Sequence, residues 1–207
     1  MSEYSNRSAL FHVEEARKIM NESSHWLDRI SIADKVSNII RMKSKSEGIS
    51  LLDVGCAQGR EVGELKKLGF TPYGIDINPE FIKSASKSYP DCKFFVGDLL
   101  DLPKPFSYSS FDIIVCLNTL FLVDVNIALH RIIQTLKIGG IGVFTLDEEI
   151  YDLEKNRIHY SLDVGSTISN LCNVVVFHNE SYKRTDKTPF RHTHLQHIIG
   201  IHKVEDY

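Results

Sequence analysis

Three aspartates at the ends of apolar runs, together with one glycine-rich loop, are the residues of this chain best suited to chemistry. The stretch LLDVGCAQGREV, residues 51–62, places Asp53 two residues before Gly55, and Ala57 and Gly59 complete the loop. Glycines let the backbone turn sharply and let a ligand lie against the main chain. The helix expected after the loop directs its free N–H groups at the same place. The sequence therefore predicts a binding site for a nucleotide-like ligand.

The position of Asp53 indicates which ligand suits the loop. A dinucleotide-binding loop reads G-x-G-x-x-G and directs a helix N-terminus at a pyrophosphate. Here the pattern is D-x-G-x-A-x-G, and a carboxylate at the strand end favours a cationic ligand over a phosphate. The stretch resembles motif I of the class I methyltransferases, whose cofactor S-adenosylmethionine carries an ammonium, a sulfonium and a carboxylate. Ala57 stands where that family usually has glycine.

The other two aspartates suit the adenosine half of such a cofactor. Asp76 ends the expected second strand, where a carboxylate can accept hydrogen bonds from both ribose hydroxyls, although a dehydrogenase uses the same device. In the methyltransferase family an acid after the third strand accepts from the adenine amino group, and Asp98 and Leu99 match that pattern. The resemblance implies these cofactor-binding residues: Asp53, Gly55, Ala57, Gly59, Asp76, Ile77, Asp98, Leu99 and Asn118.

A mostly parallel α/β sheet is the framework expected to position these residues. Strands are predicted at 51–54, 71–76, 94–96, 111–123 and 141–146, and helices at 60–68, 79–89 and 124–138. Four motifs in order, the last a G-G pair after a helix, resemble the seven-stranded, Rossmann-like fold of the family, with helices on both faces. In the tail we expect helical structure at 147–157 and 160–172, then strands at 173–179 and 194–203. Those two strands predict a C-terminal antiparallel hairpin.

Apolar stripes at helical spacing predict two helices before the sheet, at 8–23 and 24–43. We therefore divide the chain into an N-terminal segment, 1–44, and a cofactor-binding domain, 45–207. The segment could be merely structural, or it could form a lid or cap. In the second case Tyr4, Phe11 and Trp26 are candidate substrate contacts.

Histidines gather in the tail, in RHTHLQHIIGIH at 191–202. Alternation along a strand places His192 and His194 on one face, and we expect them at the cofactor edge with His178 and Arg191. A solvated hairpin rim is the plainest interpretation. Alternatively Arg191 contacts the substrate, and His178, His192 or His194 acts as hydrogen-bond partner or general base. A metal site from the three histidines is a third alternative, but no carboxylate or cysteine completes it in sequence, so no metal is expected.

Composition limits the classes of partner. The chain has 207 residues and a formal net charge of −3, which gives no electrostatic reason to expect nucleic-acid binding. No apolar run approaches the ~20 residues of a membrane span. The four cysteines show no metal or disulfide spacing, which favours a reducing, cytoplasmic location. The sequence does not indicate an oligomeric state.

The function implied by the resemblance is methyl transfer from S-adenosylmethionine to an unidentified acceptor by in-line displacement. A small-molecule acceptor is favoured over nucleic acid. One alternative is a non-catalytic S-adenosylmethionine-binding or scaffold subunit, and a less favoured one is a nicotinamide-dependent oxidoreductase. Because a sulfonium methyl is already activated, the protein mainly has to align the two reactants, so no motif marks a catalytic residue.

Overall fold

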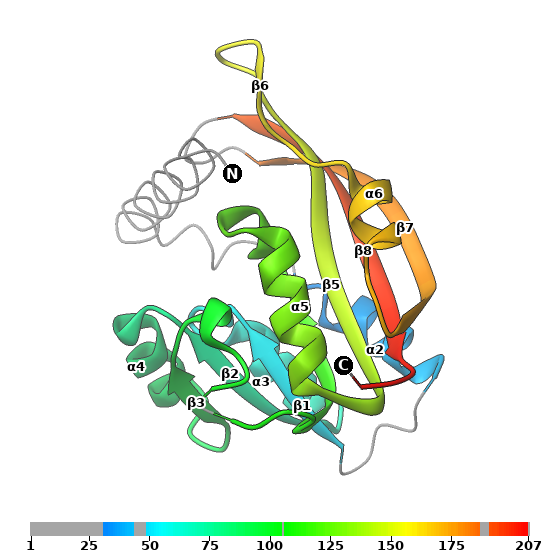
Figure 1. Ribbon diagram of the computed structural model, residues 1–207. Helices are drawn as coiled ribbons and strands as arrows, with labels where there is room; N and C mark the ends of the chain where they lie inside the picture. Colours follow the sequence, from blue (N-terminus) through cyan, green and yellow to red (C-terminus); the bar gives the residue numbers. More distant parts are fainter. Residues whose placement is uncertain (1–30, 44–48, 105, 187–190, 207) are drawn as a thin grey trace.

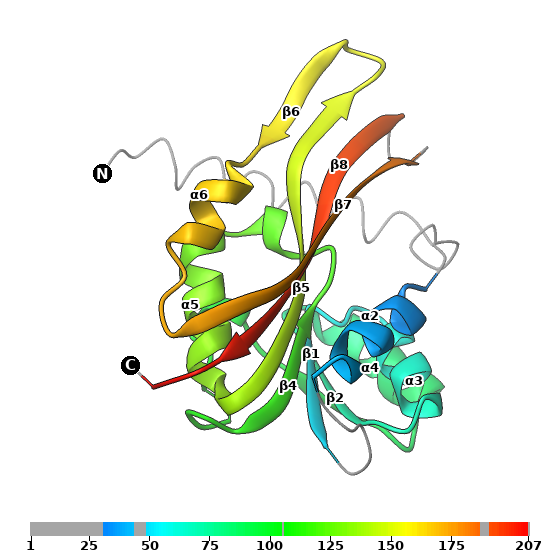
Figure 2. The same ribbon diagram turned by 90° about the vertical axis from the view of Figure 1, so that its right-hand side faces the viewer.

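One twisted sheet of eight strands organises the protein, and helices cover both of its faces (Figures 1 and 2). The structure, a computed structural model, describes residues 31–43, 49–104, 106–186 and 191–206. Its strands are β1 (Ser50–Val54), β2 (Thr71–Asp76), β3 (Lys93–Val96), β4 (Phe111–Cys116), β5 (Leu136–Asp152), β6 (Arg157–Ser161), β7 (Val174–Asp186) and β8 (His192–Lys203). The helices are α2 (Ala33–Arg41), α3 (Arg60–Lys67), α4 (Pro79–Ser88), α5 (Val125–Thr135) and α6 (Val164–Ser169), with short 3-10 turns at Leu99–Asp101 and Leu120–Leu122.

The strand order β3-β2-β1-β4-β5-β8-β7 confirms the predicted topology. The first five strands in this order pair in parallel, and β8 and β7 follow as an antiparallel hairpin. The additional strand β6 pairs only with β5. In this arrangement β1 to β5 place their carboxyl ends at one edge of the sheet, where ligands bind in open α/β folds.

The two faces of the sheet bury different helices because neighbouring strand residues point in opposite directions. Leu52 and Val54 of β1 pack with the apolar side of α5, whereas Leu51 packs with α2 and α3. Figure 2 shows α5 and α6 on one side and α2, α3 and α4 on the other. Among the described residues, no helix has the length and apolarity needed to cross a membrane.

The prediction of helical structure at 147–157 is wrong. Residues 147–152 continue β5 and pair with the start of β8, and Arg157 begins β6. Glutamates at 148, 149 and 154 favour a helix locally, but pairing with a strand some 45 residues later overrides that preference. A turn with Asp152 accepting from the backbone N–H groups of Glu154 and Lys155, and with Asn156 at φ +52°, joins the two strands.

Two other boundaries differ from the prediction. Strand β4 ends at Cys116, so the apolar residues up to 123 form a loop and a 3-10 turn. Helix α5 ends at Thr135, and Gly139, at φ +78°, lies within β5.

The helix predicted at 8–23 lies outside the described residues, as do Tyr4, Phe11 and Trp26. The described part of the second predicted helix, 24–43, is α2.

Strand β5 is 17 residues long and extends beyond the parallel sheet. It pairs with β4 only as far as Phe144, while its pairing with β8 continues to Asp152. We call the extended region the arm; it comprises β6 together with residues 147–152, 182–186 and 192–196. In Figure 1 the arm rises above the edge at which the parallel strands end. It thereby places side chains of β5, β7 and β8 beyond that edge.

Candidate cofactor and acceptor site

The loop between β1 and α3 adopts a backbone that needs small residues. Gly55, Ala57 and Gly59 all have positive φ values, of +76°, +47° and +79°. A Cβ atom on Gly55 would overlap the Thr119 side chain, and one on Gly59 would lie 2.8 Å from the Phe94 ring. The loop therefore needs glycine at 55 and 59, because its backbone packs closely against Thr119 and Phe94 at these positions.

Ala57 is the one loop residue that takes a left-handed conformation with a side chain, which costs an L-residue about 1–2 kcal/mol. Replacing Ala57 with glycine should remove this strain, while the more flexible unfolded chain offsets about 0.4–1 kcal/mol of the gain. We expect Ala57→Gly to raise the free energy of unfolding by up to ~1 kcal/mol in urea denaturation. The matched control Ala85→Gly, inside helix α4, should instead lose ~1 kcal/mol or more. An equal loss in both variants would contradict the strain argument.

Asp53 lies at the end of β1 with only 2% of its surface exposed. Burial raises the pKa of this carboxyl well above its usual value, and the nearby carboxylates of Glu61 and Asp76 raise the pKa further. A buried carboxylate of this kind is stabilised by a cation. Asp53 is thus suited to an ammonium group, in line with its expected role.

Asp76, at the end of β2, holds the glycine loop. Its Oδ2 accepts a hydrogen bond from the backbone N–H of Ala57, and its Oδ1 accepts one from the N–H of Asn78, both at 2.9 Å. Burial raises the pKa of Asp76, and these two hydrogen bonds partly offset the increase. The carboxylate oxygens have further lone pairs, so Asp76 can fix the loop and accept from a ligand at the same time.

The residues expected around an adenine lie at the ends of β2 and β3. Asp98 accepts a hydrogen bond from the Leu100 N–H through Oδ1, at 2.8 Å, and so caps the 3-10 turn. Asp98 therefore has a structural role as a cap, which does not depend on a ligand. Leu99 is buried, and Ile77 is 43% exposed beside Asp76, which leaves an apolar side chain at this edge.

Asn118, after β4, connects the cofactor edge to the arm. It has a φ of +55°, and its N–H donates to Thr145 Oγ1 at 2.7 Å. Its Oδ1 accepts from Arg184 Nη1 at 2.6 Å and from Gln196 Nε2 at 3.1 Å. Sequence reasoning missed Arg184 and Gln196 because they approach Asn118 only through the pairing of β7, β8 and β5.

A buried carboxylate–imidazole pair lies beside this connection. His194 Nδ1 donates to Asp147 Oδ1 at 2.6 Å, and Gln196 Nε2 donates to the same oxygen at 3.0 Å. Both Asp147 and His194 are 2% exposed. Within the described parts of the chain, Asp147 Oδ2 is buried without a hydrogen-bond partner. Asp147 therefore keeps one carboxylate oxygen whose capacity to accept a hydrogen bond is unused.

Aromatic side chains border the pair. The Phe121 ring lies 6.3 Å from the His194 ring and 6.5 Å from the Tyr160 ring, both edge to face. Burial, with a smaller contribution from Asp147, raises the pKa of Tyr160 to about 12, so its hydroxyl stays protonated at neutral pH. The polar groups of the arm and the apolar ring of Phe121, from the 3-10 turn Leu120–Leu122, thus lie in one place.

The tail histidines are brought together only in part. His192 and His194 share a face, as predicted, and Asp186 lies opposite His192 in the ladder. His178 lies opposite Gly200, eight positions along β8 from His192, which is about 27 Å away in a strand. The structure therefore separates His178 from the site. Arg191 is exposed, and its backbone N–H donates to Glu154 at the far end of the arm.

Asp186 is the carboxylate that sequence reasoning did not connect with the histidines. The residues TDKTP, 185–189, had the composition of a connector, whereas β7 runs to Asp186. Asp186 Oδ2 lies 3.4 Å from His194 Nε2 and 3.8 Å from His192 Nε2, so the pairing of β7 with β8 brings a carboxylate to both histidines.

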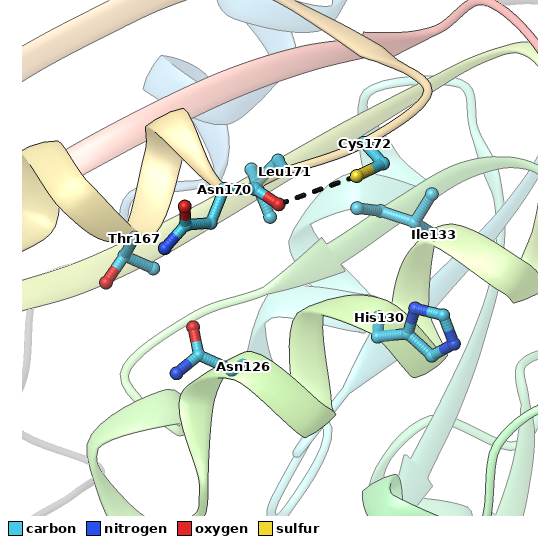
Figure 3. A pocket seen from close by; sticks show the side chains of 7 residues that line it. All are labelled: Asn126, His130, Ile133, Thr167, Asn170, Leu171 and Cys172. Atoms are coloured by element: carbon cyan, nitrogen blue, oxygen red, sulfur yellow. Dashed lines mark hydrogen bonds between the residues drawn. The ribbon is translucent and has the colours of Figure 1, made fainter.

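A shallow hollow of about 230 Å³ lies elsewhere, between α5 and the segment around α6 (Figure 3). It is lined by Asn126, His130, Ile133, Thr167, Asn170, Leu171 and Cys172. None of these residues belongs to the loop, the strand ends or the arm. The hollow is consequently separate from the candidate site.

Comparison with known proteins agrees with this geometry. The family model described as a methyltransferase domain matches residues 52–144, from β1 to β5. A search of curated protein sequences finds no match.

Solved structures with the same fold are numerous. A TehB-like S-adenosylmethionine-dependent methyltransferase from Corynebacterium glutamicum is 20% identical, covers 93% of this chain and 98% of its own, and has a TM-score of 0.63. A complex of the Trm112 methyltransferase activator and a protein described as a methyltransferase, from Haloferax volcanii, gives 18% identity, coverages of 83% and 89%, and a TM-score of 0.62. The [4+2]-cyclase SpnF is 14% identical, covers 83% of this chain and 81% of its own, and has a TM-score of 0.64.

Proposed function

Because residues 52–144 of this chain are a methyltransferase domain in a class I, S-adenosylmethionine-dependent fold, we propose that the protein methylates a small molecule held against the arm. The observation that carries the proposal is the convergence of functional groups at one sheet edge. The glycine loop and the ends of β1, β2 and β3 offer groups suited to the cofactor. Asn118, at the same edge, accepts hydrogen bonds from Arg184 and Gln196 of the arm.

The residues at the strand ends fit S-adenosylmethionine. We assign to the loop main chain, which turns with positive φ at Gly55, Ala57 and Gly59, a direct backbone contact with the cofactor. We assign the ammonium to Asp53 and the ribose hydroxyls to Asp76. We assign the adenine to Asp98 Oδ2 and the Leu99 N–H, with Ile77 against its face. When bound, the cofactor supplies an activated methyl group that an acceptor atom takes by in-line displacement.

The arm supplies what an acceptor requires. Arg184 and Gln196 reach Asn118 and can orient a polar acceptor at the cofactor edge. The unpartnered Asp147 Oδ2 can accept from an acceptor O–H or N–H, and Phe121 offers an apolar contact. Holding two reactants in line can itself lower a barrier by about 7–11 kcal/mol. The acceptor class suggested is a small molecule with a hydroxyl or amine next to an apolar group.

Two other functions share this fold. A binding or scaffold subunit would retain the cofactor groups without turnover, and the complex of the Haloferax volcanii methyltransferase with an activator is an example of a partnered relative. The cyclase SpnF has a similar fold and a different named activity, so fold alone does not decide the reaction.

Calorimetric titration and a turnover assay test the proposal. We expect the protein to bind S-adenosylhomocysteine and S-adenosylmethionine and not NAD. With a panel of small hydroxyl and amine compounds, at least one should release S-adenosylhomocysteine above the rate without acceptor. Tight NAD binding without a response to S-adenosylhomocysteine would overturn the assignment. Cofactor binding with no release from any compound, but release with RNA or protein substrates, would overturn the small-molecule part.

A further inference from the structure

The end of the β7–β8 hairpin carries a group of side chains whose chemistry the methyl transfer does not require. Asp186, His192 and His194 offer one carboxylate and two imidazoles, and their ligand atoms all lie within 4.8 Å of one another. His192 is 6% exposed and His194 2%. Two histidines and one carboxylate are a ligand set that binds divalent transition metals and leaves coordination positions open.

The distances are close to those that a shared ion needs. Metal–ligand bonds of about 2.0–2.2 Å in a tetrahedral site place the ligand atoms roughly 3.3–3.6 Å apart. Asp186 Oδ2 lies 3.4 Å from His194 Nε2 and 3.8 Å from His192 Nε2. Both histidines are thus near this spacing from Asp186, and because the three ligand atoms lie within 4.8 Å of one another, side-chain rotations must bring the two imidazoles closer together on one ion.

The hydrogen bond from His194 Nδ1 to Asp147 sets the orientation of the imidazole ring and directs Nε2 towards Asp186. A carboxylate only accepts, so the 2.6 Å hydrogen bond to Asp147 places a proton on Nδ1, and in the neutral ring the lone pair is then on Nε2. Metal-ligating histidines commonly donate their other N–H to a buried carboxylate in this way. Gln196 holds Asp147 Oδ1 from a second direction, at 3.0 Å.

We propose that Asp186, His192 and His194 bind a divalent transition-metal ion, with Zn²⁺ the best match to two imidazoles and a carboxylate. Phe121 packs against His194, so the ion would lie beside the acceptor groups described above. An acceptor oxygen or nitrogen could occupy an open position on the ion. That role depends on the proposed function, whereas metal binding does not.

Arg184 competes with the ion for two of the three ligand side chains. Its Nη2 lies 3.4 Å from His194 Nε2, and its Nε lies 3.5 Å from Asp186 Oδ2. A guanidinium repels a metal cation, so Nη2 must leave His194 when the ion binds, while Nη1 can remain on Asn118. In the competing interpretation, Asp186 is only the ion-pair partner of Arg184 and the histidines.

The test uses the untagged full chain, stripped with a chelator and titrated with Zn²⁺ by calorimetry and with Co²⁺ by visible absorption. We expect a saturable site whose Co²⁺ spectrum is that of a low-coordinate nitrogen–oxygen site. Asp147→Asn should weaken binding about 10–100-fold. Asp186→Asn and His192→Gln should weaken it more, and Arg184→Met should strengthen it. His178→Gln, on the same hairpin but away from the cluster, is the matched control and should bind as the parent does.

Folding is checked on the metal-free variants by thermal unfolding and by S-adenosylhomocysteine binding, neither of which requires the ion. Absence of saturable Zn²⁺ binding to the folded parent would overturn the proposal. Binding that survives unchanged in folded Asp186→Asn and His192→Gln would do the same, because the ion would then lie elsewhere. Failure of cofactor binding with intact metal binding would instead reject the proposed function alone.

Discussion

Asp53→Asn is expected to weaken binding of S-adenosylhomocysteine by about ten- to a hundredfold, corresponding to the ~1.5–3 kcal/mol of a hydrogen bond to a charged group. The ligand-free variant should be at least as stable as the parent. The reason is that Asp53 is buried near Glu61 and Asp76, so that its ionised form is unfavourable until a cation binds. Calorimetry gives the affinity, and urea denaturation gives the free energy of unfolding.

Asp53→Asn should also remove the part of the pH dependence of stability and of ligand affinity that the Asp53 carboxyl causes. The folded protein holds the Asp53 proton more tightly than the unfolded chain, because burial raises the pKa. Asp53 therefore contributes most stability below its unfolded pKa of ~3.9, and this contribution is lost as pH rises through the folded value. Ligand affinity changes in the opposite sense and falls as pH drops through that value, since an ammonium pairs with the ionised carboxylate. Both trends should be absent in Asp53→Asn.

Asp112→Asn is the matched control, because Asp112 lies on the neighbouring strand β4 at the opposite edge of the sheet. Burial alone would raise the pKa of Asp112, but hydrogen bonds from Ser50 and Lys137 outweigh it and lower the pKa. Its contribution to stability is present above its unfolded pKa and is lost as pH falls through the lowered value. Ligand affinity should be unchanged in this variant. If Asp53→Asn also binds with parental affinity, the ammonium assignment is wrong.

Asp76→Ala is expected to reduce both cofactor affinity and stability. Loss of the ribose acceptor accounts for ~1.5–3 kcal/mol of affinity. Loss of the acceptor for Ala57 and Asn78 leaves two backbone N–H groups without their partner, which should lower the free energy of unfolding by about 1–3 kcal/mol. The glycine loop should also become less ordered, which adds to the loss of affinity. Calorimetry and urea denaturation measure the two quantities.

The control for Asp76 is Asn78→Ala, two residues further along. Asn78 caps α4 by accepting from the N–H groups of Glu80 and Phe81, so its loss should cost ~1 kcal/mol of stability. Affinity for S-adenosylhomocysteine should remain within a few-fold of the parent. Parental affinity in Asp76→Ala would contradict the ribose assignment, whatever happens to stability.

The parts of the site predicted from sequence are those encoded by local patterns. The loop from Asp53 to Gly59 follows from glycine spacing, and Asp76 and Asp98 follow from their place after short apolar strands. Each of these needs only a dozen neighbouring residues to be recognised. The structure places all of them at the carboxyl ends of parallel strands, as the topology requires.

The proposed acceptor side could not be predicted in the same way because four distant segments form it. Asn118, Asp147, Arg184 and His194 meet only through the register of β5 with β8 and of β8 with β7. Local composition at 147–157 favoured a helix, and Asp186 was assigned to a connector. Both errors concealed the same feature, the arm, whose strands are long only because they pair with each other.

The length of β5 also has a consequence for how this protein could diversify. One continuous strand belongs to the parallel sheet up to Phe144 and to the arm from Asp147, and its register with β8 is irregular just inside the arm, between Asp147 and Glu149. A slip of one residue would turn every following side chain to the other face, so this irregularity sets which residues of the arm face the site. Insertions, deletions or segment exchange after this point would change the proposed acceptor surface while the parallel strands keep their pairing. Under the proposed function, selection for new acceptors can therefore act on the arm end of β5 while the end in the parallel sheet stays fixed.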